Sequence, residues 1–209
     1  MTESKVEIST NAAKWPLFAV WVRRLLGLIS TLVLVRYLTP TDFGIVMSAM
    51  VVLMFAQALT EAGARQYIIQ QEYLNHEQIS CAWTFSLILK SVASFFIIIA
   101  SLFAYEFFDS DKMKDVLQVC SILPLLSGLK NPGLFIEEKN DQYRTLNLLI
   151  VITKIIALPI TICVAVIYQT YWSLIIGTIF ETTLEVILTY RFNKFRPKFT
   201  LVGYKRQLK

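Results

Sequence analysis

Seven charged residues stand inside otherwise apolar stretches of the sequence. They are Arg23, Arg24, Lys90, Lys130, Lys154, Glu181 and Glu185. A charge at the centre of a bilayer costs about 2.5–3.5 kcal/mol on insertion scales, so such side chains usually face the interior of a helix bundle or a wet cavity. These residues are therefore the candidates for binding chemistry in this chain.

The charges allow two interpretations. Glu181 and Glu185 are four positions apart, which places them on one face of a helix. In the first interpretation, they pair with Lys or Arg, and the ion pairs hold the helices together. In the second, the surplus of cations lines an inward cavity that attracts a phosphate or diphosphate head group, while apolar faces accommodate a lipid tail. Lys130 and Lys154 also have side chains long enough to reach toward the membrane interface.

Residues for other kinds of chemistry are sparse. The three cysteines lie in or beside apolar segments without C-x-x-C spacing, which is typical of inert buried thiols, and His76 is the single histidine. The sequence contains no phosphate-binding P-loop and no G-x-S-x-G motif, and its short acidic loops lack metal-ligand spacing. We therefore expect a protein that is not an enzyme and that has no metal or cofactor.

Six long apolar segments carry the seven charges. They span residues 15–37, 42–62, 79–107, 116–136, 146–168 and 173–192. Hydrophobic residues make up 56% of the chain and charged residues 17%, whereas soluble domains average about 45–50% and about 25%. One crossing needs about 20 apolar residues, and the segments lack the alternation of a membrane β-barrel. The sequence thus predicts an all-α integral membrane bundle of about six transmembrane helices.

These segments divide the chain into three parts. Residues 1–14 form a polar N-terminal segment, residues 15–192 the six-helix lobe, and residues 193–209 a basic tail. The N-terminus lacks the pattern of a cleaved signal peptide, so the first helix is expected to remain as an anchor. A basic tail beside a membrane helix is more often a cytoplasmic topology signal than a nucleic-acid site. We expect no nucleic-acid partner.

Prolines and glycines predict where helices end or bend. Pro40 fixes its own φ and disfavours helix at the residue before it, so the first helix should end in this turn. Thr41 or Asp42 should then cap the second helix. The fourth apolar segment contains three residues that should kink its helix: Pro124, Pro132 and Gly133.

The distribution of Lys and Arg predicts the orientation in the membrane. The set of helix ends that includes both termini is richer in Lys and Arg than the other set by about four to one. Cytoplasmic loops carry this excess. Both termini are therefore expected in the cytoplasm, and the turn at 38–44 is expected outside.

That turn also carries a resemblance to a known family. Residues 36–44 read R-Y-L-T-P-T-D-F-G, which resembles the R-x-L-(S/T)-P-x-(D/E)-(F/Y)-G turn after the first helix of polysaccharide flippases. These are the lipopolysaccharide and O-antigen exporters of the multidrug/oligosaccharidyl-lipid/polysaccharide (MOP) superfamily. Residues 57–63 and 68–70, and the polar stretches 74–78 and 137–144, are similar to the corresponding parts of the family.

The resemblance implies a function in the bacterial inner (plasma) membrane. Such proteins translocate a polyprenyl-diphosphate-linked oligosaccharide from the cytoplasmic to the outer leaflet, and cationic cavity residues of relatives hold the diphosphate. The substrate-binding role thus falls on the seven charged residues above. The expected partners are the lipid-linked oligosaccharide and membrane lipids.

Members of that family have about twelve to fourteen helices, so this chain resembles an N-terminal six-helix lobe alone. We expect its tail to lead to a second lobe, or the chain to act as a homodimer. Two alternatives are a membrane scaffold of a polysaccharide-synthesis complex that transports nothing, and a truncated inactive fragment. A third is an exporter of small cations or drugs that uses Glu181 and Glu185, against which the surplus of cations argues.

Overall fold

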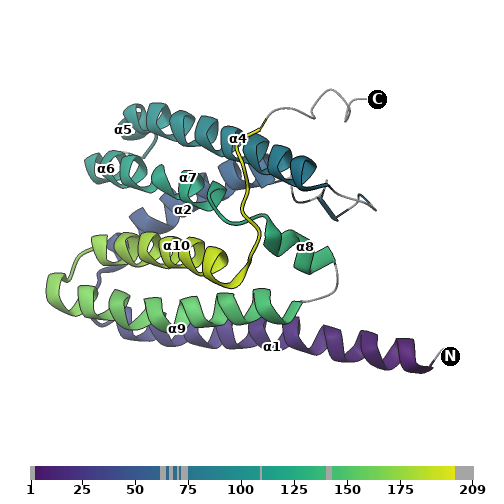
Figure 1. Ribbon diagram of the computed structural model, residues 1–209. Helices are drawn as coiled ribbons and strands as arrows, with labels where there is room; N and C mark the ends of the chain where they lie inside the picture. The colour runs from purple at the N-terminus through teal and green to yellow at the C-terminus, as the bar shows by residue number, and fades with distance from the viewer. Residues whose placement is uncertain are drawn as a thin grey trace.

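The computed structural model describes residues 3–61, 65, 68–69, 71, 75–108, 110–139 and 143–200. This part of the chain is mainly helical and contains no strand (Figure 1). Its helices are α1 (Glu3–Leu34), α2 (Pro40–Glu61), α4 (His76–Leu102), α5 (Ala104–Phe108), α6 (Asp111–Cys120), α7 (Ile122–Gly128), α8 (Gly133–Lys139), α9 (Tyr143–Tyr168) and α10 (Trp172–Phe192).

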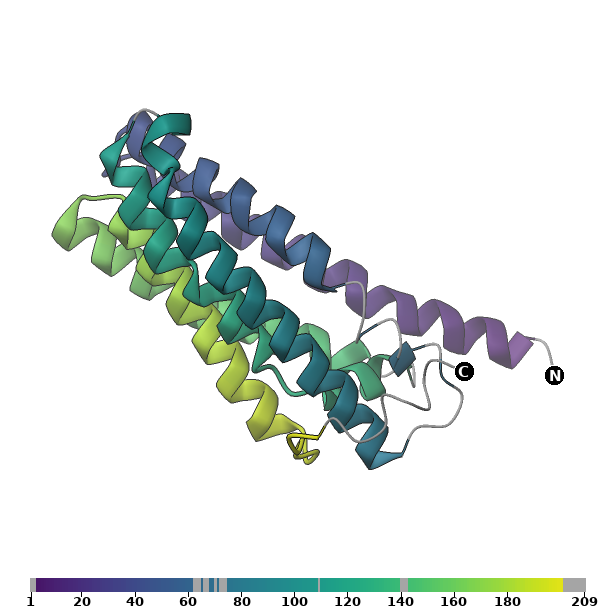
Figure 2. The same cartoon turned by 90° about the horizontal axis from the view of Figure 1, so that it is seen from above.

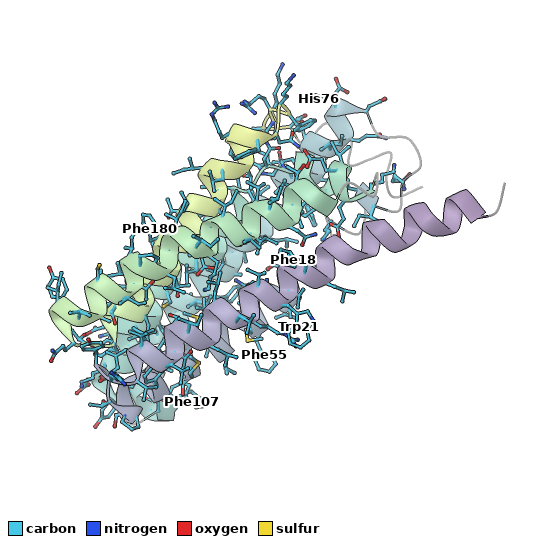
Figure 3. The ribbon with its side chains drawn as sticks, turned by 90° about the horizontal axis from the view of Figure 1, so that it is seen from below. Phe18, Trp21, Phe55, His76, Phe107 and Phe180 are labelled. Carbon is cyan, nitrogen blue, oxygen red and sulfur yellow. The ribbon has the colours of Figure 1, made fainter. Side chains whose placement is uncertain are left out.

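The long helices have the length and composition of membrane spans. Five of them qualify individually: α1, α2, α4, α9 and α10. The bent run from α6 to α8 qualifies as a sixth span when its parts are taken together. The prediction of an all-α membrane bundle of about six helices is confirmed. Large apolar side chains cover the outside of this bundle, and Trp21, Phe55 and Phe107 project from its surface (Figure 3).

Helix α1 begins earlier than predicted. It starts at Glu3, whereas the sequence predicted a first helix that begins at about residue 15. Its apolar part is Leu17–Leu34. Hydropathy identifies only the part of a helix that is apolar enough to lie in lipid. A helix can continue beyond that part, because polar residues such as Glu and Lys also favour helix. The third span differs in a similar way, because α4 begins at His76 and ends at Leu102, and α5 follows as a short helix of its own.

The turn between α1 and α2 is capped by a different residue from those predicted. Thr39 is the capping residue: its Oγ1 accepts a hydrogen bond from the Asp42 N–H at 3.2 Å. In return, Asp42 Oδ2 accepts from the Thr39 N–H at 3.1 Å, which completes a reciprocal capping box. Proline is favoured at the first helical position, so Pro40 begins α2 and the residue before it becomes the cap. The prediction of Thr41 or Asp42 as the cap is wrong for this reason.

The fourth apolar segment is broken, as its prolines and glycine predicted. The axes of Asp111–Gly128 and Gly133–Lys139 differ by 60°. The main-chain groups at this break have partners: Trp83 Nε1 donates to the Lys130 carbonyl at 3.1 Å, and the Asn131 N–H donates to Thr189 Oγ1 at 3.2 Å. Non-helical backbone at membrane depth requires such partners. The break between α7 and α8, residues 129–132, is therefore stabilised by hydrogen bonds to the neighbouring helices.

The helices form two groups that meet through α10. Helix α9 packs against both α1 and α10, while α4 packs against α2, α6 and α7 (Figures 1 and 2). Helix α10 also contacts α6 and α7, which joins the groups. A Cβ atom added at Gly177 would lie 2.8 Å from Thr161 Cγ2, so the missing side chain is what lets α9 and α10 approach so closely.

One end of the bundle, here called the basic end, gathers the loops that the charge distribution grouped together. Arg65 forms an ion pair with Glu138, and the His76 ring stacks on the Phe195 ring at 4.3 Å between centroids. At the opposite end, Lys112 lies 5.6 Å from the centroid of the Tyr171 ring. Which end faces the cytoplasm stays a prediction.

The segment 193–200, here called the strap, is extended and leaves α10 to cross α4 at the basic end (Figure 1). Its main-chain N–H groups at Lys198 and Thr200 donate to Ser80 Oγ and Thr84 Oγ1, each at 3.3 Å. The rest of the predicted basic tail, residues 201–209, lies outside the described residues.

Candidate functional site

A cavity of about 460 Å³ lies in the half of the bundle nearest the basic end. Cavities of about 300–1,000 Å³ are typical of small-molecule sites. Residues of α1, α4, α9 and α10 and of the break line this cavity. Among the described residues, its charged lining consists of four cations and one carboxylate: Arg23, Arg65, Lys90, Lys130 and Glu185. We call this space the large cavity.

The apolar part of the lining comes mainly from α8 and α9. Leu134 and Phe135 contribute from the first turn of α8, and Leu146, Leu149 and Ile150 from the start of α9. The large cavity thus combines positive charge with hydrocarbon. That combination suits a ligand with an anionic group attached to an apolar chain.

The cations reach the large cavity in different ways. Lys90 is buried on α4, and its Nζ donates to the Ser127 carbonyl at 3.5 Å. Gly128 lets α7 and α4 come close here, because a Cβ there would lie 2.9 Å from Leu87 Cδ1 and 3.4 Å from Lys90 Cδ. Arg23 lies on the exposed surface of α1 and borders the large cavity from that side. The guanidinium group of Arg65 donates two hydrogen bonds to the carboxylate of Glu138, and its Nε lies 3.0 Å from Oε2.

Two ion pairs join α10 to its neighbours. Lys130 Nζ lies 2.9 Å from Glu185 Oε1, and Lys154 Nζ lies 2.7 Å from Glu181 Oε2. The first pair connects α10 to the break, and the second connects α10 to α9. Both predicted anions are thus paired with predicted cations, as the first interpretation of the sequence proposed.

The pair Lys154–Glu181 belongs to a second cavity of about 90 Å³. Ser30, Thr161 and Thr178 contribute hydroxyl groups to its lining. A space of this size holds a few water molecules. The second cavity is therefore a small polar space between α1, α9 and α10.

The structure divides the seven predicted site residues into three groups. Arg23, Lys90, Lys130 and Glu185 line the large cavity. Lys154 and Glu181 line the second cavity, and Arg24 is an exposed residue that borders neither. The two interpretations of the charges therefore apply to different residues of the set.

Sequence reasoning missed several lining residues of the large cavity. Arg65 was counted only as a loop cation that indicates orientation, and nothing local distinguishes it from the other loop cations. Trp83 and Asn131 lie in the wall because of long-range contacts with the break and the strap. The indole of Trp83 reaches the break, and the rings of Trp83 and Phe199 lie edge to face at 5.2 Å between centroids.

A hydrogen-bonded cluster fixes the wall of the large cavity beside the strap. Asn131 Nδ2 donates to the Phe195 carbonyl at 2.8 Å, and its Oδ1 accepts from the Gly133 N–H at 2.9 Å. Asn193 Nδ2 donates to Glu137 Oε1 at 2.8 Å, and its Oδ1 accepts from the Phe195 N–H at 2.8 Å. Because each asparagine bonds through both ends of its amide, the break, α8 and the strap are held as one unit.

The charged residues around the large cavity favour an anionic ligand over a cationic one. Among the described residues of this lining, four cations stand against Glu185, and Glu138 outside the lining pairs with Arg65, so positive charge remains in excess. Arg presents a planar fork that matches phosphate oxygens, while Lys acts as a point charge. Within the described residues, no group of three or more His, Cys, Asp or Glu side chains has the geometry to hold a metal ion.

Comparison with known protein families gives a match over most of the chain. A family model described as polysaccharide biosynthesis protein matches residues 33–207. No curated protein and no solved structure matches the chain. The match includes the break, the strap and four of the five charged residues of the large cavity, and Arg23 precedes it.

Proposed function

Because this chain belongs to the polysaccharide biosynthesis protein family, we propose that it translocates a polyprenyl-diphosphate-linked oligosaccharide across the membrane. The polysaccharide would be of the lipopolysaccharide or O-antigen type. The observation that carries this proposal is the excess of cations in the large cavity, beside an apolar lining. A diphosphate joined to a polyprenyl chain has the matching combination of charge and hydrocarbon.

The binding site of this proposal consists of Arg23, Arg65, Lys90 and Lys130. Lys154 and Glu181 are left outside it because they line the second cavity, whose volume of about 90 Å³ is too small for a head group. Charge-assisted contacts between these cations and phosphate oxygens are about twice as strong as neutral hydrogen bonds. The leucines and the isoleucine at the start of α9 accommodate the first isoprenoid units.

The orientation that we propose places the basic end and both termini in the cytoplasm of a bacterial cell, with the bundle in the inner membrane. The excess of Lys and Arg at this end supports that choice. The large cavity lies in the half of the bundle nearest this end, where a lipid-linked oligosaccharide made in the cytoplasm would arrive.

We further propose that a second six-helix lobe covers the exposed face of α1. Arg23 and Arg24 are exposed within the apolar span Leu17–Leu34. A cation on a lipid-facing surface is costly, at about 2.5–3.5 kcal/mol on insertion scales. A second lobe would enclose Arg23 between two bundles and complete the large cavity on its open side.

A comparison of two adjacent arginines tests the proposed function. Arg23→Gln removes a cation of the large cavity, whereas Arg24→Gln removes the neighbouring cation that borders neither cavity. Purified protein in detergent would be titrated with farnesyl diphosphate and with uncharged farnesol. Arg23→Gln and Lys90→Gln should each weaken binding of the diphosphate about tenfold, which corresponds to about 1.4 kcal/mol.

The outcomes of this comparison separate the possibilities. The effect of Arg24→Gln should be clearly smaller than that of Arg23→Gln. Equal affinity for farnesyl diphosphate and farnesol would refute an anion site in the large cavity. Flip of a labelled polyprenyl diphosphate in proteoliposomes then measures translocation, and binding without any flip would favour a scaffold that holds the lipid-linked intermediate.

The scaffold remains the second candidate function, and the two ion pairs favour it. If the charges serve only to hold the helices together, a single charge reversal should lower stability. Exchanging the two partners of an ion pair should then restore that stability. In a scaffold, the double variant Lys130→Glu/Glu185→Lys should retain both stability and surface polysaccharide. In a transporter, it should retain stability but lose binding of the diphosphate, because the cation has moved from the break to α10.

A further inference from the structure

We infer that Glu185 occupies the anion-binding position of the large cavity in the absence of substrate, and that a phosphate-bearing head group displaces it from Lys130. This inference rests on the proposed function, because it assumes that the large cavity binds a diphosphate. The carboxylate and the ammonium group are 2.9 Å apart, and both line the large cavity. Their side chains are 25% and 31% exposed, so the pair is accessible from that space.

The composition of the lining supports an internal anion. Glu185 is the one carboxylate among the charged residues that the structure places in this lining, and it faces three further cations there. Arg65 already has Glu138 as its partner. The carboxylate of Glu185 carries one negative charge and pairs with one lysine. A diphosphate carries more negative charge and more acceptor oxygens than this carboxylate. It can therefore replace Glu185 on Lys130 and contact neighbouring cations at the same time.

The second ion pair of α10 shows why the position of Glu185 matters. Glu181 lies one helical turn away and binds Lys154 at 2.7 Å, with side-chain exposures of 30% and 26%. The two pairs are thus nearly equal in geometry and exposure. They differ in the adjoining space, which is about 460 Å³ for Lys130–Glu185 and about 90 Å³ for Lys154–Glu181. Only the first pair adjoins enough space for a head group to enter and compete.

Displacement of Glu185 also has a mechanical consequence. Lys130 belongs to the break, and Glu185 belongs to α10, so their ion pair holds these elements together on the side of the large cavity. A head group that takes Lys130 removes this connection. The hydrogen bond from the Asn131 N–H to Thr189 Oγ1 remains and keeps the break near α10. Substrate binding thus loosens one contact of α10 without detaching the helix.

Glu185→Gln tests this inference in the full chain, with Glu181→Gln as the matched control. Glutamine keeps the shape of the side chain and removes the competing charge. Binding of farnesyl diphosphate should become about two- to fivefold tighter in Glu185→Gln, the range expected for releasing one partly exposed ion pair. Glu181→Gln breaks the other pair and should leave the affinity within about twofold. Glu185→Asp, which keeps the charge on a shorter side chain, should tighten binding less than Glu185→Gln.

The same titrations distinguish failure of the inference from failure of the proposed function. If the wild type prefers farnesyl diphosphate over farnesol and Lys130→Gln weakens that binding, the anion site stands. Unchanged or weaker binding in Glu185→Gln would then overturn the inference alone. If the wild type shows no such preference, or Lys130→Gln binds as tightly as the wild type, the anion site and the inference both fail. The double variant Lys130→Gln/Glu185→Gln should bind like Lys130→Gln, since the released cation is then absent.

Discussion

The substitution Gly133→Ala should lower the stability of the bundle by displacing Asn193. A Cβ atom at position 133 would lie 2.7 Å from Asn193 Nδ2 and 2.5 Å from its Cγ, which is closer than real Cβ contacts come. The amide must therefore move. It donates to Glu137 at 2.8 Å and accepts from the Phe195 N–H at 2.8 Å, and both hydrogen bonds would be lost.

The expected cost follows from these two hydrogen bonds. Each contributes about 0.5–1.5 kcal/mol, and a buried polar group left without a partner costs about 1–3 kcal/mol. Asn193 is buried. We expect a loss of about 2–4 kcal/mol in the free energy of unfolding. For a chain of this length, that corresponds to a fall in Tm of roughly 5–15 °C.

Thermal unfolding of the purified protein in detergent, followed by size-exclusion chromatography of heated samples, measures this change. Gly27→Ala is the control, because nothing lies within 4 Å of a Cβ at that position. It should leave the Tm unchanged or raise it slightly, since alanine favours a helix over glycine by about 0.5–1 kcal/mol.

A double variant makes the test specific to the contact between these two residues. Asn193→Ala loses the same hydrogen bonds and removes the atoms that a Cβ at Gly133 would meet. Gly133→Ala/Asn193→Ala should therefore be about as stable as Asn193→Ala alone, because residues in contact are not additive. A wild-type Tm for Gly133→Ala, or additive losses in the double variant, would refute the reasoning.

Three further predictions concern other contacts of the fold. Thr39→Ala should cost about 1 kcal/mol through loss of the cap of α2, and Thr41→Ala should cost clearly less in the same thermal assay. Gly177→Ala should separate α9 from α10 and lower the Tm, and Thr161→Ala in the same chain should recover part of the loss; no recovery would contradict the close approach. Trp83→Phe should cost about 0.5–1.5 kcal/mol, because it removes the indole hydrogen bond to the break and keeps an aromatic ring. An unchanged Tm would show that this hydrogen bond does not contribute to the stability of the bundle.

Local physics explains why much of the fold was predictable. The length of an apolar run decides whether a helix can span a bilayer, and the run itself is read directly from the sequence. Proline removes a main-chain donor wherever it occurs, so the break near Pro132 was predictable as well. The ends of the helices were harder. Helix α4 begins at His76 because Asn75 and Gln78 form a capping box, with the Asn75 N–H donating to Gln78 Oε1 at 2.9 Å.

The candidate site was predictable only in part. The rule that charges avoid lipid selected Arg23, Lys90, Lys130 and Glu185, and the structure places all four in the lining of the large cavity. The same rule selected Arg24, which is exposed and borders neither cavity. Hydropathy is averaged around a helix, so it does not decide which of two adjacent arginines turns toward the bundle.

The order of residues alone is enough to show that this chain forms apolar helices, that the fourth apolar segment breaks near Pro132, and that charges lie among the helices. It also determined the short turn at 36–44, whose residues carried the resemblance to a family. Which charges adjoin the same cavity depends on the packing of the folded chain. Glu181 and Glu185 differ by one helical turn, yet one binds α9 beside the second cavity, and the other binds the break beside the large cavity. The reason is that such pairing depends on how each helix is rotated and on which helices pack together, and these are fixed by contacts between residues far apart in the chain.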